Sequence, residues 1–131
     1  MKSLIAGLAL GLLASPAFAI EASATSVTCA AAVTTGIGGN QALRDLEPSD
    51  LPVLAYAALP EGRQYKVLTT IGEASIQLYV YRVNDKLMHM QIYAPTGDGK
   101  QVLADTPLAG DTSELTWATL HGTEQVTVYC Y

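Results

Sequence analysis

Cysteine, histidine and cationic side chains are scarce in this chain, and their scarcity excludes several classes of function. The 131 residues include 2 cysteines and 2 histidines, and 7 lysines and arginines stand against 12 aspartates and glutamates. Neither His89 nor His121 has a neighbouring histidine, cysteine or carboxylate at the spacing of a zinc site, so we expect no metal. The formal charge of −5 repels phosphate backbones, and the few basic residues are scattered. We therefore expect no nucleic-acid partner.

Motifs for cofactors and for nucleophilic catalysis are also missing. The glycine-rich stretch Gly36-Ile37-Gly38-Gly39 has Gln41 where a dinucleotide-binding loop needs its third glycine, and no Gly-Lys-Ser/Thr occurs. No serine lies in a Gly-x-Ser-x-Gly turn. Asp98 is a single carboxylate in a tight turn, whereas a calcium loop supplies several. We therefore expect no cofactor and assign no catalytic residue.

Long apolar runs are absent after the first residues of the chain. One lysine precedes an apolar stretch over residues 4–13, and Ala17 and Ala19 then complete the pattern of a cleaved secretory signal. No later stretch approaches the roughly 20 apolar residues that a membrane-spanning helix requires. We expect a signal peptide at 1–19 and one soluble domain at 20–131, without a membrane span, in the periplasm or secreted.

The two cysteines lie near the two ends of the expected mature chain. Cys29 follows its start closely, and Cys130 is the penultimate residue. In an oxidising compartment an even number of distant cysteines favours a structural disulfide, whereas redox-active and metal-binding pairs are usually closely spaced. We expect one Cys29–Cys130 bond that joins the terminal strands.

Alternation and turn residues predict an all-β domain. Val27, Cys29, Ala31 and Val33 alternate with smaller or polar residues, as in a strand with one buried face. Further strands are expected at 65–71, 74–83, 87–94, 101–106, 112–120 and 125–131, separated by turn-forming residues. Short connections favour antiparallel pairing of neighbours. The sequence therefore predicts a mainly antiparallel meander of about seven strands that closes into a small barrel or sandwich.

One short helix is expected at 51–59, across one opening or face of the sheet. Leu51, Leu54, Ala55 and Ala58 recur at the spacing of one helical face. Ser49 is a suitable N-cap, and a proline follows the segment.

A three-residue loop at 84–86 predicts the pairing of the strands that flank it. Tyr81 then faces His89, Tyr79 faces Gln91, and Gln77 faces Tyr93, while the methionines and aliphatic residues share the opposite face. A two-residue loop would mix polar and apolar side chains on both faces. Likewise, a four-residue loop at 121–124 places Trp117 opposite Val128, beside the expected disulfide.

The tyrosine-rich face is the candidate binding site. It comprises Gln77, Tyr79, Tyr81, His89, Gln91 and Tyr93, and the last strand adds Thr127, Tyr129 and Tyr131 on its outward side. Tyrosine combines a broad apolar ring with a polar tip, so such a face suits a protein or glycan partner. The alternative interpretation is that tyrosine simply suits the solvated side of a sheet.

Size, export signal, single disulfide and β-rich pattern are similar to those of small periplasmic lysozyme inhibitors, and a tryptophan near a disulfide resembles immunoglobulin-like domains. No stretch carries the inhibitors' motif, and Trp117 precedes the second cysteine instead of following the first. We assign no family.

The sequence thus favours a non-enzymatic, exported binding module, such as an inhibitor or envelope accessory protein, with an unknown protein or glycan of the cell envelope as partner. Two alternatives remain open. One is a small hydrolase whose loop carboxylates converge, alone or with a histidine. The other is a carrier of a small apolar ligand inside the barrel, which requires an enclosed cavity.

Overall fold

A computed structural model describes residues 20–36, 41–56, 59–109, 113–119 and 122–131. The expected signal peptide, most of the glycine-rich stretch, and His121 lie outside the described residues. None of the described helical segments is long and apolar enough to span a bilayer.

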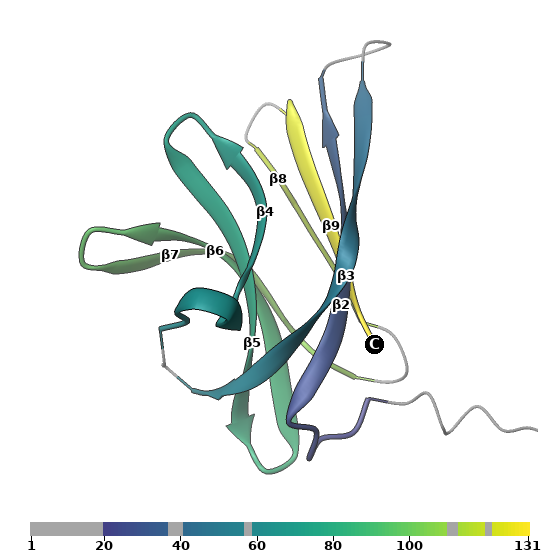
Figure 1. Cartoon of the computed structure of the whole chain (residues 1–131), viewed down its shortest axis with the longest axis vertical. Coiled ribbons are helices and arrows are strands. Elements are labelled where there is room, and N and C mark those ends of the chain that lie inside the picture. Colours follow the sequence, from purple (N-terminus) through teal and green to yellow (C-terminus); the bar gives the residue numbers. More distant parts are fainter. Residues whose placement is uncertain (1–19, 37–40, 57–58, 110–112, 120–121) are drawn as a thin grey trace, which may run out of the picture.

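The described residues form one strongly curved sheet of eight strands, arranged as a nearly closed barrel (Figure 1). The strands are β2 (Ser26–Thr35), β3 (Ala42–Ala55), β4 (Lys66–Ile71), β5 (Ala74–Asn84), β6 (Leu87–Thr96), β7 (Gly99–Pro107), β8 (Ser113–Ala118) and β9 (Glu124–Cys130). Their order is β7-β6-β5-β3-β2-β9-β8, and β4 also pairs with β5. The all-β, mainly antiparallel class expected from the sequence is confirmed, and a single-turn helix, η2 (Gly62–Gln64), is the one helix among these residues.

The interior of the barrel is filled with apolar side chains. Val27, Cys29, Ala31 and Val33 of β2 all point inward, as their alternation predicts. From the other side, Met90 of β6 reaches across so that its Sδ lies 3.5 Å from Sγ of Cys130. Side chains from opposite sides of the barrel thus meet at the disulfide.

The helix expected at 51–59 is wrong where the structure describes it, because β3 extends to Ala55. Leu51 and Pro52 pair with β2, and Val53 to Ala55 pair in parallel with β5, so strand pairing outweighs the local helical spacing. In the strand, alternation directs Leu51 and Val53 into the barrel core and Leu54 to the opposite face. Pro48 falls within an irregularity of the β2–β3 ladder, a position at which a strand tolerates the missing N–H.

The pairing of β5 with β6 is the one expected, but the turn that produces it is different. Tyr81 pairs with His89, Tyr79 with Gln91, and Val80 with Met90. The turn itself holds only two residues, since Asn84 pairs with Leu87, and an irregularity between Arg82 and Asn84 adds the extra residue. A two-residue turn with one bulged residue therefore gives the register of a three-residue loop.

Pairing of β8 with β9 differs from the expectation by two residues. Trp117 pairs with Val126, and Ser113, not Leu115, lies opposite Cys130. The strand β8 ends at Ala118, two residues earlier than expected. The hydroxyl of Thr119 then lies 3.2 Å from that of Thr123 and accepts a hydrogen bond from the N–H of Glu124. A shift of two keeps each side chain on its expected face, so Trp117 still packs against the core, but it does not lie beside the disulfide.

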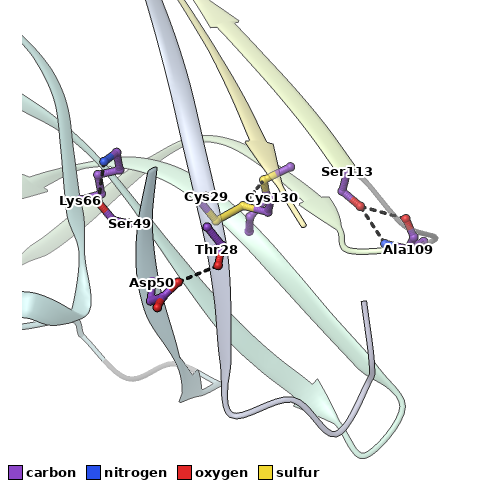
Figure 2. The surroundings of a disulfide bond; sticks show 9 residues. Thr28, Cys29, Ser49, Asp50, Lys66, Ala109, Ser113 and Cys130 are labelled. Atoms are coloured by element: carbon purple, nitrogen blue, oxygen red, sulfur yellow. Dashed lines mark hydrogen bonds between the residues drawn. A yellow bond between two sulfur atoms is a disulfide. The ribbon is translucent and has the colours of Figure 1, made fainter. Parts of the chain in front are cut away.

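The disulfide links β2 to β9, which are hydrogen-bonded neighbours in the sheet (Figure 2). Cys29 and Cys130 are direct cross-strand partners with Cα atoms 4.1 Å apart, and both are fully buried. The bond therefore covalently reinforces the ladder between the first and last described strands.

Candidate functional site

The expected tyrosine face exists, but it is a buried cluster and not a solvated platform. Tyr79, Tyr81 and Tyr93 are 1%, 5% and 2% exposed, and they form a second apolar cluster on the side of the sheet opposite the methionines. The rings cover one another: Tyr79 stacks on Tyr81 and meets Tyr93 edge-on, each at a centroid distance of 5.3 Å. Leu54 and Tyr65 pack against the cluster from β3 and from the segment before β4.

The polar members of this face are also largely buried. Gln77 and Gln91 are 8% and 6% exposed, and the hydroxyl of Tyr93 donates to Oε1 of Gln77 at 2.7 Å. The outward residues of β9 lie on a different part of the sheet, where Tyr129 and the following Tyr131 are exposed. The sequence therefore predicts correctly that the tyrosines share one face of the sheet. Its prediction that this face is exposed to solvent is wrong.

A pocket of about 450 Å³ opens beside the buried tyrosines. We call it the aromatic pocket; its walls are Tyr56, Tyr79, Tyr81, Gln91, Lys100, Val102 and Asp105. Tyr56 and Val102 are 66% and 51% exposed, so they supply accessible apolar surface, whereas Tyr79 and Tyr81 close the inner side. The ring of Tyr56 rests on that of Tyr81 at 5.6 Å between centroids.

An irregularity in β7 directs the side chain of Asp105 into the aromatic pocket. Tyr93 pairs with Val102, but the next pair along is Ile92 with Ala104, so Leu103 is an extra residue. Ordinary alternation would place Asp105 on the face opposite Val102. The extra residue restores Asp105 to the pocket side, and Leu103 and Ala104 both pack against the barrel core.

Asp105 is the most strongly held side chain of the site. Its Oδ2 accepts hydrogen bonds from the hydroxyl of Tyr81 at 2.6 Å and from Nε2 of Gln91 at 2.8 Å, and its Oδ1 lies 2.5 Å from Nδ1 of His89. Burial opposes the charge of this carboxyl group, but the hydrogen bonds from His89, Tyr81 and Gln91 together hold its pKa below the ordinary value. The carboxylate is thus ionised and fixed in position at neutral pH.

Burial has the opposite effect on the tyrosine hydroxyls. It raises the pKa of Tyr79 to about 12, and the negative charge of Asp105 adds to that rise. Burial also raises the pKa of Tyr81, which the hydrogen bond to Asp105 raises further, and that of Tyr93. These hydroxyls stay protonated at neutral pH and can donate hydrogen bonds.

Lys100 is the one cation in the wall of the aromatic pocket. Its Nζ donates to the hydroxyl of Tyr79 and lies 4.2 Å from the centroid of that ring and 5.6 Å from the centroid of Tyr93. The only contact of salt-bridge geometry among the described residues joins His89 to Asp105, so no described carboxylate contacts the ammonium group of Lys100. Partial burial lowers the pKa of Lys100, and the nearby charge of Asp105 opposes that shift.

Four residues of the pocket wall are not among the site residues predicted from the sequence: Tyr56, Lys100, Val102 and Asp105. Tyr56 lies in the segment whose spacing predicts a helix, Lys100 lies between two expected strands, and Val102 is one of several strand valines. Asp105 falls in the strand expected at 101–106, and the sequence carries no signal for the bulge that turns it toward the tyrosines. Among the described residues, no group of three or more histidine, cysteine, aspartate or glutamate side chains is arranged to hold a metal ion.

Comparison with protein-family models, characterised proteins and solved structures finds no match. The function is therefore argued from the site itself.

Proposed function

We propose that the protein is an exported, non-enzymatic binding module whose ligand site is the aromatic pocket. The observation that carries this proposal is the combination of accessible aromatic surface at Tyr56 with polar groups held rigidly behind it. A ligand that enters meets a fixed carboxylate, a lysine and an amide, all on the strands β6 and β7. Sites of this size with apolar walls and a few oriented polar groups are typical of small-molecule recognition.

Two features support export to the periplasm or the cell exterior. The sequence begins with the pattern of a secretory signal, and the structure contains a fully buried disulfide of the kind that persists in oxidising compartments. The partner is proposed to be a component of the cell envelope, because that is what an exported binding module meets.

The proposal is tested by nuclear magnetic resonance with the isotope-labelled mature protein. The probes are a panel of neutral oligosaccharides, acidic oligosaccharides and tyrosine-containing peptides. At least one probe is expected to shift the amide signals of Gln91, Val102 and Asp105 in a saturable manner. Tyr56→Ala should abolish the shifts, and Tyr129→Ala, which removes another exposed tyrosine, should preserve them. A panel that leaves these amides unchanged would contradict the proposal.

A hydrolase is the second candidate, favoured by the contact between His89 and Asp105. A carboxylate that orients an imidazole is the arrangement of a general base. A serine hydrolase also requires a serine hydroxyl within reach of the histidine. The hydroxyl groups of Ser49, Ser75 and Ser113 instead form hydrogen bonds with Lys66, Gln77 and Ala109. Release of new reducing ends from the acidic oligosaccharides, lost in His89→Gln, would establish hydrolysis and refute a purely binding role.

A further inference from the structure

The groups that line the aromatic pocket indicate which chemical class of ligand it can bind. This inference rests on the proposed function and concerns what the pocket binds. The pocket wall offers three kinds of group: an accessible aromatic face, one cation without a contacting carboxylate, and oxygen acceptors.

The aromatic face and the cation together favour a ring that carries a negative group. Tyr56 presents most of its ring to solvent, which suits stacking against the flat, apolar face of a ring. Lys100 uses one of its three N–H groups on the hydroxyl of Tyr79. The remaining donors and the positive charge are free to meet an anion.

The acceptors distinguish a sugar ring from an aromatic acid. Oε1 of Gln91 is buried and has no hydrogen-bond partner among the described residues, although its Nε2 donates to Asp105. Oδ1 of Asp105 accepts from His89 alone and retains further lone-pair capacity. Ligand hydroxyl groups can donate to Asp105, and to Oε1 of Gln91 where ligand entry uncovers that buried atom, whereas a benzoate-like ligand has no donors for either acceptor.

We propose that the aromatic pocket binds an acidic sugar, with a ring face on Tyr56, its carboxylate at Lys100, and hydroxyl groups donating to Gln91 and Asp105. The pocket volume of about 450 Å³ suits one or two pyranose rings. Acidic side chains farther than about 8 Å from the ligand are screened at physiological ionic strength, so the net charge of −5 does not prevent this. The ionised Asp105 lies in the same wall, so the proposed pose directs hydroxyl groups, and not the ligand's carboxylate, toward Asp105.

The test compares digalacturonate with the neutral galactose disaccharide of the same linkage, by calorimetric titration of the mature protein near neutral pH. Digalacturonate is expected to bind about tenfold tighter or more, since one of its two carboxylates gains a charged hydrogen bond from Lys100. Lys100→Met should remove that preference, Lys100→Arg should retain it, and Lys86→Met, which removes a cation from an exposed turn, should leave it unchanged.

Each other outcome identifies which claim fails. Equal affinity of the two disaccharides at the pocket overturns the acidic-sugar inference and leaves the proposed function standing. The same holds if neither disaccharide binds while a peptide of the panel shifts the pocket amides. If no probe of either kind reaches the pocket, both proposals fall.

Discussion

The hydroxyl of Tyr81 donates a 2.6 Å hydrogen bond to Asp105, which lies 24 positions later in the sequence. The bond joins β5 to β7 across β6, so that one carboxylate ties together three strands of the sheet. It also explains why the polar side of the aromatic pocket is rigid.

Substitutions at Tyr81 should separate the contribution of its ring to stability from that of its hydroxyl group. Tyr81→Phe removes one donor from a charged acceptor and should lower the free energy of unfolding by about 1 to 2 kcal/mol. Tyr81→Ala also removes a nearly fully buried ring and should cost about 3 kcal/mol or more. Urea unfolding gives both values, and Tyr129→Phe at an exposed position serves as the control. Equal stability of all three variants would show that the cluster contributes no packing.

Acid should weaken the fold through Asp105. Its pKa in the folded protein lies below the ordinary value of 3.8, so its contribution to stability is present above that value. The contribution is lost as the pH falls below it, through the lower folded pKa, because the unfolded state then binds more protons. The difference in unfolding free energy between the wild type and Asp105→Asn should therefore shrink as acid is added below about pH 4. A difference that stays constant down to pH 2 would be inconsistent with an ionised, hydrogen-bonded Asp105.

Alkali should weaken the fold through the buried tyrosines. The pKa of Tyr79 is raised to about 12 from 10.0, so the unfolded state releases its proton first. Stability is then complete below pH 10 and decreases as the pH rises toward 12. Tyr79→Phe should reduce the steepness of that decrease, as followed by circular dichroism and by tyrosinate absorbance. An alkaline transition unchanged by this substitution would show that Tyr79 does not control it.

The disulfide should account for a large share of the stability. It closes a loop with a sequence separation of 101 residues, for which the chain-entropy model gives about 4.7 kcal/mol, and measured losses for native bonds are usually about 2 to 5 kcal/mol. The Cys29→Ala, Cys130→Ala double variant should unfold at correspondingly lower urea concentration. Mass analysis without reductant checks the bond directly, and two free thiols in the purified protein would disprove it.

The sequence predicts those features that depend on alternation alone. The inward residues of β2 and the cross-strand partners of Tyr79 and Tyr81 follow from a period of two and the preference for one buried face. The strand β3 could not be predicted because its two prolines and its acids are unfavourable in isolation, and pairing with β2 decides its conformation. The pocket depends on the extra residue Leu103, and a bulge of this kind leaves no mark in composition or spacing.

Burial of the tyrosines likewise depends on tertiary structure. Their alternation places them on one face, but whether water reaches that face depends on Leu54, Tyr65 and Lys100. For that reason Tyr81→Ala is a core truncation and a poor test of binding. Tyr56 is the better choice, since it is mostly exposed and its loss leaves the cluster beneath it in place.

The most direct test of the aromatic pocket as the binding site is a calorimetric titration of three proteins with digalacturonate: the wild type, Tyr56→Ala and Tyr129→Ala. Truncating an aromatic contact residue typically costs 2 kcal/mol or more, so Tyr56→Ala should weaken binding by about 30-fold. Tyr129→Ala should match the wild type within about twofold. Equal affinity of the two variants would contradict the account.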